Sequence, residues 1–219
     1  MPYTYVIPDL HGRRDLLDLA LAGIDVHAAG AAATLVVLGD YVDKGPESRG
    51  VIARLREGMP GPWRRVMLKG NYDALMVAAL RGDIATDEWL QKGGDTALVS
   101  YGGDAANVPM HDIAWLDERP LFHEDRHRVY VHAGVDPVRP LLQQDAMVLL
   151  TKRYADDDDS GLGAQHVVHG HDRYPDGPLL LMNRSNLDTN AWKTGRLVIG
   201  VFDDEVPGGP VEVIEVKVD

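Results

Sequence analysis

The chain has 219 residues, of which 45% are hydrophobic and 26% are charged, a composition that supports a full apolar core and argues against disorder. It contains no cysteine, which excludes disulfides, thiol catalysis and thiolate metal sites. The net charge of -12 argues against a nucleic-acid surface, but it allows a small phosphate-bearing substrate, because bound cations can reverse the local charge.

The N-terminus leads directly into a predicted strand and has no signal-peptide pattern. No apolar run reaches the roughly 18 residues needed to cross a membrane. We therefore expect a cytoplasmic protein without a membrane segment. No segment has the composition of a linker, so we expect a single domain over residues 1–219.

The first part of the chain alternates apolar strands with amphipathic helices. Strands are predicted at 3–9, 34–40 and 64–71, and helices at 13–24, from near Pro46, and at 72–82. This alternation predicts a parallel sheet with helical crossovers. The next segment, 83–121, is expected to be helical, with breaks at two Gly-Gly pairs.

The rest of the chain has the texture of short β-strands between turns. The predicted β segments are 127–134, 165–172, 177–189, 196–204 and 210–218. We expect them to form a second sheet, mostly antiparallel or mixed. The acidic stretch 155–164 is interpreted as an exposed loop; a metal site there is the less favoured alternative. The fold class is thus α/β, with two packed sheets flanked by helices.

Polar side chains stand at the ends of five predicted strands. They are Asp9 and His11, Asp40 and Asp43, Asn71, His132, and His171. Ligand sites form just outside the carboxyl ends of strands in open α/β sheets, and carboxylate, amide and imidazole groups bind divalent metals. One such residue is usually a cap, but folding does not require this composition at five strand ends. The pattern predicts a centre for two metal ions.

The same residues lie in five ordered motifs. These are "DLHG" (9–12), "GDYVDKG" (39–45), "GNYD" (70–73), "HAG" (132–134) and "HGH" (169–171). They resemble the motifs of the phosphoprotein-phosphatase branch of the calcineurin-like metallophosphoesterases, in particular bacteriophage protein phosphatases and bacterial diadenosine tetraphosphatases. The resemblance extends from Asp9 to about Thr189. It implies a four-layer sandwich of two mixed β-sheets packed together and flanked by helices.

The resemblance also implies a set of metal ligands. The first ion would be held by Asp9, His11 and Asp40, and the second by Asp40, Asn71, His132 and His171, with Asp40 bridging. Mn²⁺ fits these oxygen and nitrogen ligands, as do Fe and Zn. The two ions would bind the phosphate and activate a bridging hydroxide that attacks phosphorus. His166 and His169 are expected to support the site from the strand.

Four further residues are implied in catalysis, and two depart from the family pattern. Lys44 stands in place of an arginine that contacts phosphate and lacks its bidentate fork. Arg153 in "LLTKR" matches the second phosphate-binding arginine. Tyr72 replaces the histidine that would protonate the leaving group in partnership with Asp43, and Asp73 replaces a neighbouring glutamate.

Tyr72 leaves three interpretations open. The enzyme could be weak on alkyl phosphates and better on aryl phosphates or anhydrides, Tyr72 could itself donate the proton with a lowered pKa, or the chain could be a phosphate-binding pseudoenzyme. In the simplest alternative Tyr72 only packs and water is the acid. We favour reduced or shifted hydrolase activity, because every metal ligand is retained.

The resemblance implies two possible substrate classes. The primary hypothesis is hydrolysis of phosphate monoesters on phosphoserine or phosphothreonine proteins, or of small phosphoesters. The alternative is hydrolysis of dinucleoside polyphosphates. Nucleotide recognition would require an aromatic or arginine platform, for which Trp89, Tyr101, Arg13 and Arg14 are candidates, although each is more often structural.

Overall fold

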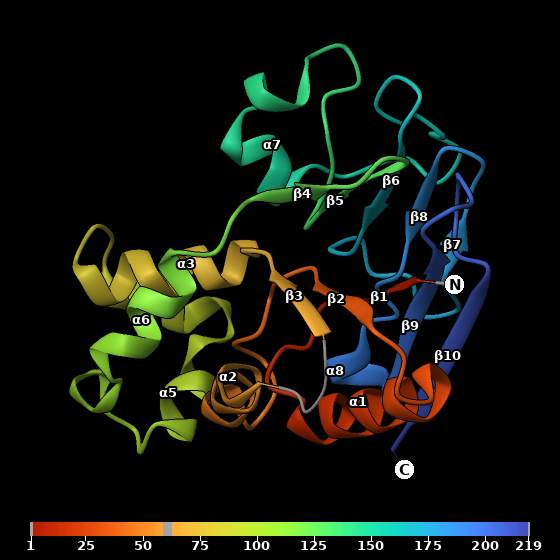
Figure 1. Cartoon of the computed structure of the whole chain (residues 1–219). Helices are drawn as coiled ribbons and strands as arrows, with labels where there is room; N and C mark the ends of the chain where they lie inside the picture. Colours follow the sequence, from red (N-terminus) through yellow and green to blue (C-terminus); the bar gives the residue numbers. More distant parts are fainter. Residues whose placement is uncertain (1, 59–62, 219) are drawn as a thin grey trace.

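Two five-stranded sheets form the framework of the protein (Figure 1). The computed structural model describes residues 2–58 and 63–218. The first sheet has the order β10-β9-β1-β2-β3 and the second β4-β5-β6-β8-β7. The strands are β1 (Tyr3–Ile7), β2 (Ala33–Val37), β3 (Trp63–Met67), β4 (Phe122–Glu124), β5 (Arg128–Val131), β6 (His166–His169), β7 (Leu179–Leu180), β8 (Arg184–Asn186), β9 (Arg196–Asp203) and β10 (Glu212–Lys217).

Helices connect these strands and cover the sheets. They are α1 (Arg14–Ala28), α2 (Ser48–Glu57), α3 (Asn71–Arg81), α4 (Thr86–Trp89), the π-helix η1 (Leu90–Gly94), α5 (Asp95–Ser100), the 3-10 turn η2 (Ala105–Asn107), α6 (Met110–Asp117), the 3-10 turn η3 (Leu141–Gln143), α7 (Ala146–Thr151) and α8 (Ala191–Thr194). The predicted helical segment 83–121 is confirmed as α4 to α6. It kinks at Gly93, whose φ is 111°.

The predicted parallel sheet is confirmed for β1, β2 and β3. The three strands pair in parallel and are in register from Tyr3↔Ala33 to Val37↔Met67. Val36 faces the second sheet, whereas Leu35 and Val37 face the helices, and all three side chains are fully buried. Burial on both faces explains why these strands read as continuous apolar runs.

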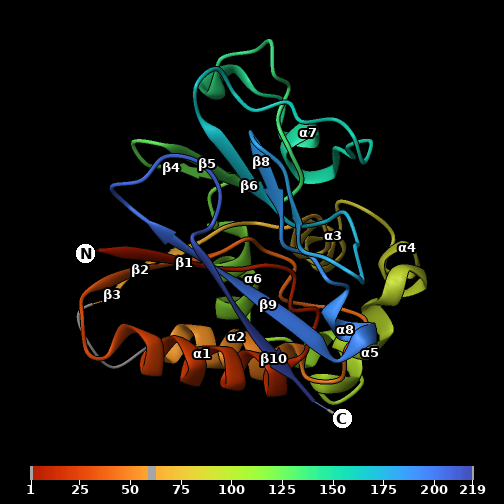
Figure 2. The ribbon, with the colours of Figure 1, turned by 90° about the vertical axis from the view of Figure 1, so that its right-hand side faces the viewer.

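Helix α1 covers the outer face of the first sheet (Figure 2). Its buried side chains recur with helical spacing, as Leu17, Leu21 and Ile24 show, while Asp18 and Asp25 are exposed. Each fully buried leucine or isoleucine contributes about 1.5–3 kcal/mol through the hydrophobic effect. This packing holds the first sheet against its helical layer.

The prediction for the last two strands was wrong. β9 and β10 were expected in the second sheet, but β9 pairs antiparallel with β1 through Tyr5↔Val201, and β10 pairs with β9. Figure 1 shows these C-terminal strands (blue) beside the N-terminal strand (red). Sequence alternation indicates which face of a strand is buried, but it does not indicate which strand is the neighbour.

The fold class is otherwise confirmed: two mixed sheets are packed together and flanked by helices (Figure 2). The apolar layer between the sheets includes Val6, Tyr130, Val168 and Phe202. Residues 155–164 form a loop, as predicted, although Asp158 and Asp159 are half-buried. No helix among the described residues is long and apolar enough to span a membrane. The single domain stays a prediction.

Candidate metal centre

The polar strand ends meet at one place between the two sheets. β1, β2 and β3 run in parallel, so the segments that follow them lie at one edge of the first sheet. β5 and β6 are also parallel and bring the segments after them to the second sheet's edge. The backbone N–H of His171 donates a hydrogen bond to Oδ1 of Asp9 at 3.1 Å and so joins the two edges.

Five of the six predicted metal ligands form two overlapping clusters. One consists of Asp9, His11 and Asp40, and the other of Asp40, His132 and His171. Within each cluster, one ligand atom from every residue lies within 4.8 Å of the others. Asp40 belongs to both clusters, as expected of a bridging ligand.

Asn71, the sixth predicted ligand, lies against the second cluster. Its Oδ1 is 2.9 Å from Nε2 of His132, and the same Nε2 is 3.5 Å from Oδ2 of Asp40. Nε2 of His11 is 3.4 Å from that Asp40 oxygen on the other side. The structure therefore brings all six predicted ligands together.

The environment of Asp40 fits a bound cation. Its Oδ2 is buried and has no hydrogen-bond partner among the residues that the structure describes. Burial raises the pKa of Asp40 to about 7 and that of Asp9 well above its ordinary value. An unpaired oxygen in a group of buried carboxylates is unfavourable in isolation and is stabilised by a positive ion.

The histidines are oriented by backbone carbonyls. Nδ1 of His11 lies 2.9 Å from the carbonyl oxygen of Val42, and Nδ1 of His132 lies 3.1 Å from that of Leu38. A carbonyl accepts from the Nδ1–H, which leaves Nε2 of each ring as the free acceptor nitrogen. Both Nε2 atoms face Asp40, where a metal ion would bind.

The backbone around the clusters is strained. His11, Asp40 and His171 have φ values of 42°, 50° and 64°, in the left-handed region that residues with a side chain seldom adopt. Gly70, in contrast, has an ordinary φ of -94°. A Cβ at Gly70 would collide with the Asp40 carboxylate, so glycine is needed there for the close approach of the two segments.

Asp43 is buried beside the clusters and is bound by a residue that sequence reasoning placed elsewhere. The indole Nε1 of Trp89 donates to both carboxylate oxygens of Asp43 at 3.0 Å. Burial raises the pKa of Asp43 to about 8, against the opposing effect of this hydrogen bond. The residue expected to pair with a histidine is thus paired with a tryptophan.

Tyr72 lies at the N-terminal end of α3 and is half-buried. Its ring meets that of His11 edge-on, with the centroids 5.0 Å apart, and Nζ of Lys44 lies 3.6 Å from its centroid. Burial raises the pKa of Tyr72, and the nearby charge of Arg173 only partly opposes this shift. Burial by itself therefore makes the hydroxyl a weaker acid, and a pKa lowered by two bound cations stays a prediction.

Asp73, the other departure in this motif, has a structural position. Its carboxylate accepts hydrogen bonds from the backbone N–H groups of Asp40 and Gly70 at 2.8 Å, and of Tyr41 at 3.0 Å. It therefore ties the end of β2 to the start of α3. This contact fixes the backbone on which Asp40 and Asn71 stand.

Three cationic side chains line the cavity at the two clusters, which we call the metal-site cavity. This cavity of about 50 Å³ is lined by Asp9, His11, Asp40, Lys44, Asn71, Tyr72, Arg153, His171 and Arg173. Lys44 and Arg153 were predicted here. Arg173 was not, although its place two residues after His171 in "GHDR", where the family pattern differs, was a signal.

Lys44 and Arg153 differ in their burial and in their contacts. Nζ of Lys44 lies 2.8 Å from Nε2 of His11, and burial lowers the pKa of Lys44 to about 8. Arg153 is exposed and donates from Nη1 to Oδ1 of Asp172 at 2.9 Å. A phosphate placed in the cavity would therefore meet positive charge from several elements.

A larger apolar cavity adjoins the metal-site cavity. It has a volume of about 550 Å³, and its lining includes Leu75, Ala78, Ile84 and Leu150. Tyr72 lines both cavities, as does Asn71. The apolar cavity therefore opens directly beside the predicted reaction centre.

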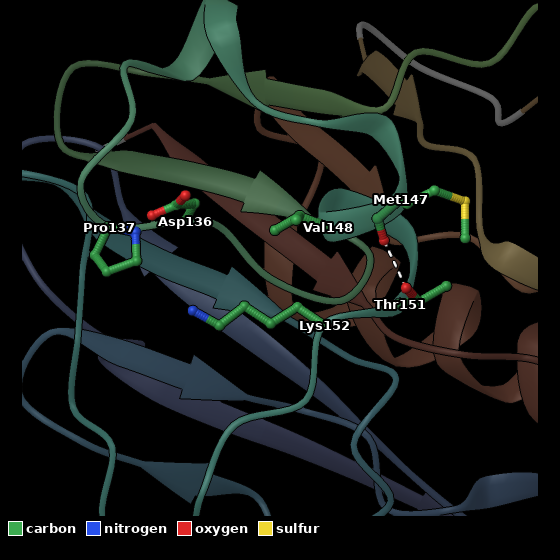
Figure 3. Close-up of a pocket in the computed structure, with 6 residues that line it drawn as sticks. All are labelled: Asp136, Pro137, Met147, Val148, Thr151 and Lys152. Atoms are coloured by element: carbon green, nitrogen blue, oxygen red, sulfur yellow. Dashed lines mark hydrogen bonds between the residues drawn. The ribbon is translucent and has the colours of Figure 1, made fainter.

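The segment "LLTKR" (149–153) forms the end of α7 and the two residues after it; Figure 3 shows Thr151 and Lys152 of this segment. Thr151 donates its hydroxyl to the carbonyl of Met147 at 2.6 Å. Lys152 extends toward the segment of Asp136 and Pro137 and donates to the carbonyl of Val135 at 2.6 Å. These residues line a cavity of about 370 Å³ that contains none of the six predicted metal ligands.

The residues considered as a nucleotide platform are structural. Trp89 and Tyr101 are buried, and the Tyr101 hydroxyl donates to Asp112 at 3.0 Å. Arg13 is paired with Asp15, and Arg14 with Asp18. None of them lines the metal-site cavity, so any nucleoside must bind to other groups.

His169 lies in β6, as expected, and makes stability pH-dependent. It is fully buried between the carbonyl of Gly170 and Nη1 of Arg184, and burial lowers its pKa from 6.5 to about 3. Between these values the unfolded chain binds a proton that the folded chain does not. Stability is therefore complete above the unfolded pKa and falls with pH below it.

We expect His169→Gln to flatten this dependence in metal-free protein. Between about pH 6 and pH 4 the free energy of unfolding should fall less steeply than in the wild type, by about 1.4 kcal/mol per pH unit. Urea unfolding in a chelator measures both slopes. The slopes should coincide between pH 7 and pH 8, and equal slopes below pH 6 would show that His169 does not control the dependence.

Comparison with known proteins identifies the family. Residues 3–189 match the family described as calcineurin-like phosphoesterase. The chain belongs to this family. The resemblance of the five motifs is therefore confirmed, and the two overlapping clusters could hold metal ions.

Curated relatives of this phosphoesterase are named symmetrical bis(5'-nucleosyl)-tetraphosphatases. The protein of Nitrosomonas europaea is 32% identical over 137 residues, which are 61% of this chain and 45% of that protein. That of Burkholderia pseudomallei strain 668 is 35% identical over 115 residues, 52% of this chain and 36% of that protein. The matched part of this chain spans less than half the length of these relatives.

Solved structures agree in fold. A proposed diadenosine tetraphosphatase superposes with a TM-score of 0.69 and 25% identity, covering 98% of this chain and 93% of that chain. A protein serine/threonine phosphatase from Saccharomyces cerevisiae gives a TM-score of 0.58 and 13% identity, covering 99% and 80%. The second likeness concerns the fold alone.

Proposed function

We propose that this phosphoesterase hydrolyses phosphoanhydride bonds of nucleoside polyphosphates, with dinucleoside tetraphosphates as the substrate class. The observation that carries this is the leaving-group side of the metal-site cavity, where Tyr72 and Arg173 stand and the family's histidine acid does not. The names of the curated relatives support the same substrate class. This was the alternative from the sequence, and it replaces the phosphoprotein hypothesis as the favoured one.

Two divalent ions fit the clusters. Asp9, His11 and Asp40 would hold one, and Asp40, Asn71, His132 and His171 the other. Mn²⁺ is the ion we expect for this mixed donor set. When bound, the two ions supply positive charge to the phosphate and lower the pKa of coordinated water.

The chain's own residues would position the substrate. Arg153 offers a planar guanidinium to phosphate oxygens and is held by Asp172, so little reorganisation is needed. Lys44, in the motif "GDYVDKG" (39–45), supplies a further positive charge to the cavity. A cation bound to His11 would repel the Lys44 ammonium, which leaves Lys44 available to the phosphate.

The chemistry of the leaving group decides between esters and anhydrides. A serine or threonine alkoxide is strongly basic and leaves readily only when it is protonated. A phosphate leaving group has a second pKa near 6 and departs as an anion near pH 7. A site that lacks an imidazole acid is therefore better suited to anhydrides than to alkyl phosphates.

The apolar cavity supports a nucleoside at this position. Its volume of about 550 Å³ and its lining by Leu75, Ile84 and Leu150 match a flat, largely apolar base better than a phosphate. Because it shares Tyr72 with the metal-site cavity, a base bound there would lie close to the phosphates. A dinucleoside polyphosphate can occupy both cavities at once.

The direct test compares substrates in the presence of Mn²⁺. We expect kcat/KM for diadenosine tetraphosphate to exceed that for a phosphoserine peptide by about 100-fold or more, the range that a missing general acid explains. Product chromatography should show two equivalents of adenosine diphosphate. Arg126→Gln, an exposed change outside the cavity lining, is the control.

Other outcomes would reassign the function. Faster turnover of the peptide than of the dinucleotide would restore the protein phosphatase hypothesis. Stoichiometric phosphate binding without turnover of any substrate would identify a pseudoenzyme. The predicted cytoplasmic location is compatible with each of these outcomes and does not separate them.

A further inference from the structure

Arg173 places a third cation in the metal-site cavity, next to the residue that replaces the family's acid. It lines the cavity together with Tyr72 and the cluster residues. Its side chain is exposed to solvent, and the cavity lining places it beside both the clusters and Tyr72.

The other two cations of the cavity already have partners. Arg153 is bound to Asp172 at 2.9 Å, and Lys44 lies 2.8 Å from His11 and 3.6 Å from the Tyr72 ring centroid. Within residues 2–58 and 63–218, no carboxylate forms an ion pair with Arg173. Unlike Arg153, Arg173 is therefore not neutralised by a carboxylate among these residues, and its charge is available to an anionic ligand in addition to that of Lys44.

Lys44 and Arg173 stand beside two clusters that fit divalent cations, and like charges close together repel, whereas Arg153 is already neutralised by Asp172. One phosphate between the clusters neutralises only part of this charge. An anion with two adjacent phosphates would bring further negative charge to the guanidinium beside Tyr72.

We propose that Arg173 forms a subsite for a second phosphate, so that the cavity binds a diphosphate unit and not a single phosphate. The subsite rests on the proposed function and deepens it. Water forms a new bond to the phosphorus held at the clusters, and the bridging P–O bond breaks. The electron pair stays on the leaving phosphate, which Arg173 holds, and the proton of the water passes to solvent.

Arg173 then does for an anhydride what the family's histidine does for an ester. A guanidinium binds phosphate oxygens in a bidentate manner and stabilises the charge that develops as the bond breaks. A monoester has no second phosphate and gains nothing from it. The position next to Tyr72 makes the substitutions at 72 and 173 parts of one change in specificity.

The test uses Arg173→Gln in the manganese-loaded protein. We expect kcat/KM for diadenosine tetraphosphate to fall by about 100-fold, as for loss of an electrostatic donor to the transition state. The value for p-nitrophenyl phosphate should be retained. Arg173→Lys should recover part of the lost activity. Arg139→Gln changes an exposed arginine that is paired with Asp136, and it should cause no loss of activity.

A binding measurement separates the subsite from turnover. By calorimetry, methylenediphosphonate should bind the wild type more tightly than orthophosphate does, and Arg173→Gln should weaken only the diphosphonate. Equal weakening of both ligands, or no weakening, would overturn the subsite. Failure of the wild type to cleave the dinucleotide would overturn the proposed function alone, because the difference in binding would remain.

Discussion

Replacing Tyr72 with histidine is expected to raise kcat/KM on a phosphoserine peptide by about 100-fold, the lower end of what a general acid contributes. The new imidazole would stand at the start of α3, where Tyr72 now packs against His11 with 5.0 Å between ring centroids. Asp43 is the residue that would orient it. The gain should stay at the lower end because Trp89 already binds both oxygens of Asp43.

Two comparisons make the Tyr72 result specific. The rate on p-nitrophenyl phosphate should change little in Tyr72→His, because p-nitrophenolate leaves without a proton. Tyr72→Phe keeps the ring but removes the hydroxyl, and we expect it to retain wild-type activity. A loss of about 100-fold or more in Tyr72→Phe would show instead that the tyrosine hydroxyl is the acid.

Asp40→Asn is expected to lower turnover about 1,000-fold, because the loss of about 4 kcal/mol of metal-derived charge stabilisation corresponds to that factor. Asp40 is the member shared by both clusters, and its Oδ2 lies 3.4 Å from His11 and 3.5 Å from His132. Asparagine tolerates the left-handed backbone at this position, where φ is 50°, so the change removes charge and not the turn. Metal analysis should show fewer than two ions per chain.

Asp43→Asn is the matched control for this prediction. It makes the same chemical change at another buried aspartate with a left-handed φ, 69°, outside both clusters. We expect it to retain the full metal content. If Asp40→Asn also bound two ions with wild-type affinity, Asp40 would not be the bridging ligand.

The grouping of the six candidate metal ligands could be predicted because they follow strands whose direction the sequence indicates. Parallel strands joined by helices end at the same edge of a sheet, so Asp9, Asp40 and Asn71 had to approach one another. The resemblance of the "HAG" and "HGH" motifs then implied that His132 and His171, after strands of the second sheet, belong to the same site. The confirmed grouping needed no knowledge of side-chain packing.

The surroundings of the ligands depend on contacts that sequence separation conceals. Trp89 reaches Asp43 from 46 residues away, from the last position of α4, directly before the π-helix η1 and the kink at Gly93. Arg173 and Tyr72 come from different sheets' edges and meet only because the sheets pack face to face. β9 joins β1 for a similar reason, since pairing depends on the path of the chain.

By itself, therefore, the sequence determined the alternation of strands and helices, the apolar faces and the order of ligands at the strand ends, because these are set by local periodicity and by strand direction. Only the tertiary structure decided which side chains face the leaving group. These positions depend on packing between distant segments. That packing gives Asp43 a hydrogen bond from Trp89 and brings Arg173 beside Tyr72.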